Sequence, residues 1–140
     1  MGAFPINDFV HFEFIRGILC IRFKKGRILN PTAAKGIVRD RIKWQKGFPY
    51  PILCDIREIL NADMPTRDYF IDHGSHLIKA LAFLVSNELD LSMFKYYVQS
   101  LQSNTPIQAF YNKEEAMAFL EEYSSMGPQP GPETGNNNGT

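Results

Sequence analysis

The sequence has no excess of charge, because its 15 lysine and arginine residues balance its 15 aspartate and glutamate residues. No global charge therefore favours nucleic acid, an acidic membrane surface or a polyanionic substrate as a partner. The longest apolar runs fall far short of the roughly 20 residues that a membrane-spanning helix needs. The N-terminus also lacks the charged start and apolar stretch of a signal peptide. These absences predict a cytoplasmic protein that neither crosses a membrane nor binds nucleic acid.

Cysteine is scarce as well. The two cysteines, Cys20 and Cys54, lie in apolar, strand-like surroundings and do not form a Cys-x-x-Cys motif. This pattern predicts buried, reduced thiols rather than a disulfide, a metal site or a redox pair. A Cys-His nucleophile is not expected either, because neither cysteine lies at a helix N-terminus, where a thiolate would be favoured.

No complete catalytic motif is present. His73 and His76 are spaced three apart, which could supply metal ligands on a continuous helix, but Gly74 between them predicts a helix end. Asp55 and Asp63 could in principle pair for acid-base chemistry, yet no glycine-rich phosphate loop accompanies them. Capping and solvent exposure explain both carboxylates. We therefore expect a protein that is not an enzyme and that holds no metal and no cofactor.

The chain does contain enough apolar residues for one well-packed domain. Its 140 residues are 44% hydrophobic, which is the size and composition of a single domain that needs no disulfide. We expect residues 1–8 to form an N-terminal segment and residues 9–123 to form the folded domain. Residues 124–140 are dense in proline, glycine and asparagine and predict a disordered tail.

Strand and helix patterns alternate through this domain. Two strands with alternating apolar and polar side chains open it as a hairpin, followed by three more strand patterns, at residues 8–14, 19–24, 52–56, 79–85 and 105–111. Helical periodicity recurs in residues 31–46, 63–72, 88–103 and 113–123. The order β-β-α-β-α-β-α-β-α predicts an α/β domain with one mixed sheet of about five strands and about four helices. All strands except the first should be parallel.

The first helix has two distinct stripes. Asn30 and Pro31 mark its start, with asparagine as the N-cap and proline at the first helical position. Apolar residues recur at helical spacing, namely Ala34, Ile37, Val38, Ile42 and Trp44. A basic stripe at intervals of four comprises Lys35, Arg39 and Lys43. This stripe could meet an acidic partner, phosphate or anionic lipid, but a solvated outer face is the simpler interpretation.

Polar residues gather after the apolar strand at 52–56, which we expect in the middle of the sheet. Open α/β sheets place their binding sites at the carboxyl ends of such strands. Asp63 is expected to cap the following helix. The two guanidiniums there could hold an anion. We therefore expect binding at this end of the sheet, by Arg57, Asp63, Thr66 and Arg67.

Several stretches occur in an order that is familiar from one family. After the hairpin come YPILCDIREI, DMPTRDYF, IKALAFLV and TPIQAFYNKEEAMAFL. Together they resemble the STAS group, which has the SpoIIAA-like fold of anti-sigma-factor antagonists, and more closely its small uncharacterised bacterial members. The resemblance covers residues 9–123 and rests on element order and apolar pattern. It implies a SpoIIAA-like fold and a non-catalytic regulatory module that binds a protein partner at the surface formed by residues 58–67.

The resemblance also implies a candidate phosphorylation site. In the antagonists, a partner kinase phosphorylates a serine in an Asp-Ser-Ser-Gly turn after the central strand. The present chain reads Asp63-Met64-Pro65-Thr66 at this place, so Asp63 matches and Thr66 is the nearest hydroxyl. Phosphate on Thr66 would lie near a helix N-terminus and beside Arg67, which would stabilise it. Because the serine and glycine are missing, a constitutive binding module is the favoured hypothesis.

Two further hypotheses follow. The resembling group shares its architecture with lipid-transfer domains, so the chain could instead bind a small anionic or lipid-like ligand. A closed apolar cavity would favour such a ligand, and a flat, partly apolar surface would favour a protein partner. The first strand is expected at the edge of the sheet and is rich in apolar side chains at Phe9, Val10, Phe12 and Phe14. An unprotected edge of this kind predicts a homodimer.

Overall fold

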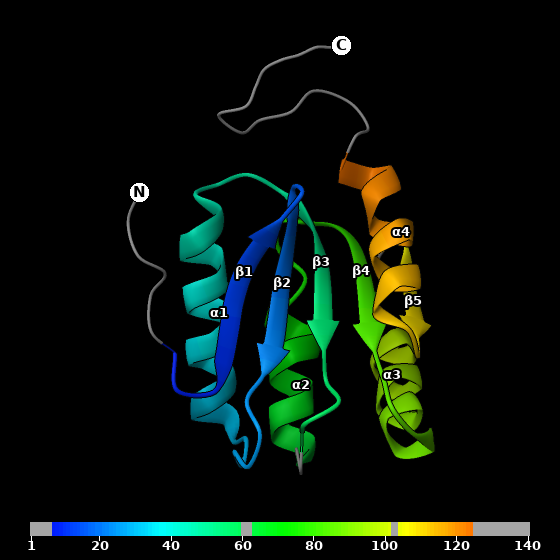
Figure 1. The fold of residues 1–140 in the computed structure, drawn as a ribbon. Coiled ribbons are helices and arrows are strands. Elements are labelled where there is room, and N and C mark those ends of the chain that lie inside the picture. The colour runs from blue at the N-terminus through cyan, green and yellow to red at the C-terminus, as the bar shows by residue number, and fades with distance from the viewer. Residues whose placement is uncertain (1–6, 60–62, 102–103, 125–140) are drawn as a thin grey trace.

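The computed structural model describes residues 7–59, 63–101 and 104–124. Its elements follow the predicted order (Figure 1): β1 (Val10–Ile15), β2 (Ile18–Phe23), α1 (Pro31–Gln45), β3 (Tyr50–Asp55), α2 (Met64–His73), β4 (Ile78–Leu84), α3 (Glu88–Ser100), β5 (Ile107–Phe110) and α4 (Lys113–Ser124). Most of the predicted N-terminal segment and of the predicted tail lies outside the described residues, and Ser124 ends α4. None of the described helices is long and apolar enough to cross a membrane.

The five strands form one sheet in the order β1-β2-β3-β4-β5. β1 pairs with β2 in the antiparallel sense, and the remaining pairs are parallel. This arrangement confirms the predicted mixed sheet and places β3 in its centre. It also brings the carboxyl ends of β2 to β5 to the same edge of the sheet.

The helices form two unequal layers. Helices α1, α2 and α3 pack on one face of the sheet, and α4 packs on the other. Figure 1 shows α2 behind the strands and α4 in front of them. Side chains alternate between the faces along each strand, so that Leu81 and Phe83 of β4 belong to the larger layer, whereas Ala80 and Ala82 face α4.

The register between β3 and β4 contains one irregularity. Tyr50 pairs with Ile78, but the next residue, Pro51, pairs with Ala80. Lys79 is therefore an extra residue in β4, as in a β-bulge. Because of it, Ile78 and Leu81 both pack on the face that is covered by α1, α2 and α3.

Helix α1 begins and ends as its sequence predicts. The Asn30 side chain accepts a hydrogen bond of 2.8 Å from the backbone N–H of Ala33, and Lys46 ends the helix in the left-handed conformation with a φ of 52°. The predicted stripe is buried at Ala34, Ile37 and Val38. However, the buried face of α1 also includes the polar residues Asp40, Arg41 and Gln45, which the periodicity did not predict.

Strand β1 lies at the edge of the sheet, as expected, but its aromatic side chains point inward. Phe12 is only 7% exposed, and the Phe14 ring lies 6.0 Å from that of Trp44 and 5.1 Å from that of Tyr50, between centroids. The aromatic side chains that motivated the homodimer prediction therefore face the core, where α1 covers them. The homodimer stays a prediction that now rests on the position of β1 at the edge of the sheet.

Candidate functional site

A cavity of about 130 Å³ lies between the sheet and its three-helix layer. The strands contribute Ile52, Cys54 and Phe83 to its lining, and the helices contribute residues that include Phe70, Phe94 and Tyr97. Almost all the lining side chains are apolar or aromatic. A concave, mostly apolar space with a few polar groups is the usual form of a small-molecule site.

Aromatic contacts explain why space remains above β3. Phe70 of α2 packs edge-on against Phe23 of β2, with 6.5 Å between the ring centroids. Phe94 and Tyr97 of α3 pack edge-on against Phe83 of β4, at 5.4 and 5.2 Å. The two helices therefore rest on strands that lie on either side of β3. The central strand between them stays partly uncovered.

The outer side of the cavity is bordered by polar contacts between α2 and α3. The Tyr96 hydroxyl donates a hydrogen bond of 3.0 Å to Asp68 Oδ1. The Arg67 guanidinium carbon lies 5.9 Å from the centroid of the Tyr96 ring, which is within the range of a cation–π contact. Arg67 and Tyr96 both line the cavity. These side chains therefore form its rim.

Arg41 of α1 also lines the cavity and is only 4% exposed. Its Nη1 donates hydrogen bonds to the Gln45 side-chain oxygen and, at 2.9 Å, to the carbonyl of His76. Its Nη2 donates to the carbonyl of Gly74 at 3.2 Å. Arg41 thus ties α1 to the backbone that follows the C-terminus of α2.

Gln45 supports the same connection. Its Nε2 donates to the carbonyl of Leu77 at 2.8 Å and to that of Phe48 at 3.0 Å. Leu77 has a φ of 64°, in the left-handed region that non-glycine residues seldom adopt. The polar end of α1 therefore holds an unfavourable backbone conformation next to the cavity.

The charge in the cavity at neutral pH comes from arginine. Burial lowers the pKa of Arg41 to about 10, so the guanidinium remains protonated. Burial, and then the charge of Asp55, raises the pKa of the Cys54 thiol to about 12. Burial also raises the pKa of the Tyr97 hydroxyl. Among the described residues, the lining contains two guanidiniums, those of Arg41 and Arg67, and no carboxylate.

The four residues predicted to bind do not form one site. Arg57 makes a two-pronged ion pair with Asp55, from Nε to Oδ1 at 2.9 Å and from Nη2 to Oδ2 at 2.8 Å. The hydrogen bond to Asp55 raises the pKa of Arg57. Its charge is therefore already balanced, and it does not line the cavity. Of the four, Arg67 is the residue that the structure places in the cavity wall.

Asp63 and Thr66 instead build the first turn of α2. The Asp63 carboxylate accepts hydrogen bonds from the hydroxyl and the backbone N–H of Thr66, and these bonds lower the pKa of Asp63. Thr66 is fully buried, at 0% exposure. A kinase could reach its hydroxyl only after this turn had opened. Phosphorylation of Thr66 stays a prediction, and it now requires that opening.

The other candidate ligands and nucleophiles lie apart. His73 stacks on Tyr69 with 4.5 Å between the ring centroids. The backbone carbonyl of His76 accepts a hydrogen bond from Arg41. No group of three histidine, cysteine, aspartate or glutamate side chains suited to a metal was found in the described residues. Cys20 lies on the α4 face, where burial raises its thiol pKa to about 11.

Arg41 is the residue that the sequence reasoning missed. A signal was available, because Arg41 and Gln45 continue the spacing of Ala34, Ile37 and Val38. A charged residue on an apolar stripe is unusual and points to a polar partner in the interior.

Comparisons with known proteins agree with this architecture. An uncharacterised DUF3478-family protein from Shewanella loihica PV-4, with a SpoIIAA-like fold, has a similar solved structure, with a TM-score of 0.58. The likeness covers 79% of this chain and 91% of that one at 16% identity, which confirms the fold alone. No curated protein matches the sequence. Residues 12–124 match a family model described as a domain of unknown function, DUF7793, and the chain therefore belongs to the DUF7793 family.

Proposed function

We propose that this domain is a non-catalytic module that binds a small, largely apolar ligand in the cavity between the sheet and helices α2 and α3. The observation that carries the proposal is the apolar cavity of about 130 Å³ above β3. A cavity of about 150 Å³ lined by aliphatic and aromatic side chains is large enough to hold benzene. The enclosed part of the ligand is therefore one ring or a short alkyl chain.

The cost of leaving such a space open supports a functional role. Protein interiors normally contain few voids larger than a water molecule. At about 24 cal/mol per Å³, a sealed cavity of this size would cost about 3 kcal/mol, which is an upper bound here because the space is partly open. That is a large part of the 5 to 15 kcal/mol by which a typical domain is stable. A ligand would recover part of this cost by filling the space.

The chemistry of the lining supports binding rather than catalysis. The Cys54 thiol, with its pKa raised to about 12, is protonated at neutral pH and is a poor nucleophile. Tyr97 likewise keeps its proton, because burial raises its pKa. The cavity therefore offers shape, apolar contact and positive charge.

The proposal can be tested with small probes that bind in the cavity and with a substitution that fills it. Binding of the neutral probes benzamide and hexanamide would be followed by NMR titration of backbone amides. We expect shifts in β3, α2 and α3, and we expect Cys54→Leu to weaken binding by about tenfold or more because it occupies the space. Cys54→Ala is the matched control, since it removes the same thiol but leaves the space open. Equal binding by Cys54→Leu and Cys54→Ala would contradict the proposal.

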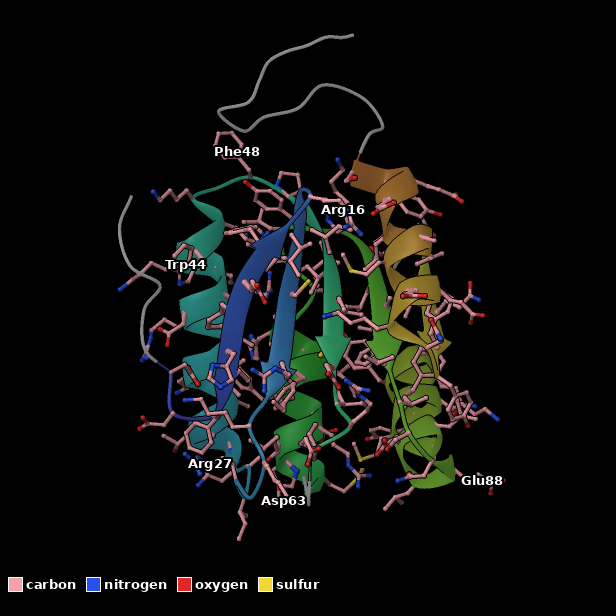
Figure 2. All side chains as sticks on the ribbon, in the orientation of Figure 1. Arg16, Arg27, Trp44, Phe48, Asp63 and Glu88 are labelled. Carbon is pink, nitrogen blue, oxygen red and sulfur yellow. The ribbon has the colours of Figure 1, made fainter. Side chains whose placement is uncertain are left out.

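A regulatory module that binds a protein partner is the second candidate. One observation favours it: Met64, in the first turn of α2, is 48% exposed within the surface expected to bind a partner. Capture of partners by Met64→Glu would be compared with capture by the wild-type domain. Phe48→Glu is the control, because Phe48 is also exposed and lies at the opposite end of the molecule from Asp63 (Figure 2). Identical partners for all three proteins would contradict this candidate.

A further inference from the structure

We propose that the ligand of this cavity is a small apolar carboxylate and that Arg41 binds its carboxylate group. This inference rests on the proposed function and adds the chemical class of the ligand and the residue that recognises it. It starts from the position of Arg41, which is 4% exposed and still contributes to the cavity wall.

The hydrogen bonds of Arg41 leave room for a ligand. A guanidinium has five N–H donors. Three are used, two from Nη1 to Gln45 and His76 and one from Nη2 to Gly74. No acceptor among the described residues takes the Nε–H or the second Nη2 hydrogen. Two donors therefore remain on a side chain that borders the cavity.

Arg41 also lacks a counter-ion, unlike Asp40 and Asp55, two of the three buried carboxylates among the described residues. Asp40 is bound by Asn7 at 2.9 Å and by Arg39 at 3.2 Å, and Asp55 is bound by Arg57. Within residues 7–59, 63–101 and 104–124, no carboxylate lies within ion-pair distance of Arg41. Buried charges in proteins are normally paired. An anion is therefore the group that this site lacks.

The carbonyls that Arg41 already binds do not replace that anion. They lie at and just beyond the C-terminus of α2, where a helix dipole presents the equivalent of about half a negative charge. The dipole therefore offsets only about half of the guanidinium charge. Since the described lining contains no carboxylate, the charge of Arg41 is not fully balanced there.

The available donors and the apolar walls favour a carboxylate over a phosphate. Two N–H groups match the two oxygens of one carboxylate, as Arg57 and Asp55 already demonstrate in this protein. A phosphate monoester carries up to two charges and a third oxygen, which would be desolvated without enough donors. A carboxylate attached to one ring or a short chain fits both the charge and the volume.

Matched acid and amide probes test this inference in the unmodified protein. Dissociation constants would be measured by calorimetry for benzoate, benzamide, hexanoate and hexanamide. We expect each acid to bind roughly tenfold to a hundredfold tighter than its amide, which is the range for hydrogen bonds to charged groups. Equal affinity of acid and amide would overturn this inference and leave the proposed function standing. Failure of all four probes to bind at millimolar concentration would overturn both.

Substitution of Arg41 identifies the residue responsible. We expect Arg41→Gln to remove the preference for the acid while keeping the affinity for the amide, which also reports that the cavity is intact. Arg39→Gln is the matched control, because Arg39 lies on the same helix with its side chain 67% exposed. A preference that persists in Arg41→Gln, or that disappears only in Arg67→Gln, would overturn the assignment. If Arg41→Gln does not fold, the acid and amide comparison in the wild type decides.

Discussion

The two faces of the sheet differ in how closely a helix approaches them. On the α4 face, Ala80 and Ala82 of β4 meet Ala116 of α4, and all three are fully buried. On the other face, Phe83 of the same strand meets the rings of Phe94 and Tyr97. Small residues allow close packing, whereas large rings standing edge-on hold the helix away from the neighbouring strand. The cavity and its arginines lie on the face with the rings.

This difference suggests a division of roles between the faces. The α4 face contributes compact burial, because α4 covers β3 and β4 with fully buried side chains that include Leu120. The face with α1, α2 and α3 combines burial with an accessible space. Substitutions of the same kind on the two faces should therefore have different consequences.

The largest difference is expected for truncation of buried side chains. Leu120→Ala on α4 should lower the free energy of unfolding by about 2 to 5 kcal/mol, because it leaves a cavity in a closed core. Ile71→Ala on α2 should cost less than about 2 kcal/mol, because Ile71 is partly exposed and already borders open space. Urea denaturation measures both values. Equal losses would show that the two faces are packed alike.

The second comparison enlarges a buried side chain instead of truncating it. One cysteine lies on each face, so the same substitution can be made on both. Cys20→Leu should destabilise the domain by about 1 to 3 kcal/mol, because it adds atoms to the tightly packed α4 face. Cys54→Leu should stabilise it by about 0.5 to 2 kcal/mol, because it fills existing space. The alanine variants at both positions control for loss of the thiol. Destabilisation of similar size at both positions would refute the comparison.

A smaller effect on stability, which depends on pH, is expected from Asp63, the N-cap of helix α2 on the cavity face. Hydrogen bonds from the hydroxyl and then the amide of Thr66 lower the pKa of Asp63 in the folded state. Its stabilisation is therefore complete above the unfolded pKa of about 3.9 and is lost as the pH falls through the folded value. Asp63→Asn should lose less stability than the wild type between pH 5 and pH 3 in urea denaturation. Parallel pH profiles of the two proteins would contradict this role for Asp63.

Much of the fold could be predicted because its signals are local. The N-caps Asn30, Asp63 and Asn112 each accept a hydrogen bond from the third residue that follows, which is a pattern visible in the sequence. The apolar strands β3 and β4 were likewise predicted from their short length and flanking residues. Local sequence was sufficient because capping and strand formation depend mainly on neighbouring residues.

The site could not be predicted in the same way, because it depends on contacts between distant residues. Arg41 is buried because carbonyls 33 and 35 positions along the chain accept its hydrogen bonds. Helical periodicity assigns a charged side chain to the solvent unless such partners are known. The cavity depends in turn on how Phe83 meets the rings of α3, which is a property of packing. Arg57, by contrast, was expected to bind, but Asp55 two residues earlier neutralises it.

The extra residue in β4 lets the cavity wall tolerate a change in the length of the chain. Ile78 lines the cavity although it is separated from Leu81 by an odd number of positions, and the register shift at Lys79 makes this possible. Deletion of Lys79 would leave Ile78 two positions before Leu81, and because strand side chains alternate between faces, both would stay on the cavity face of a regular strand. A single deletion could thus remove the bulge without changing which side chains of β4 line the cavity.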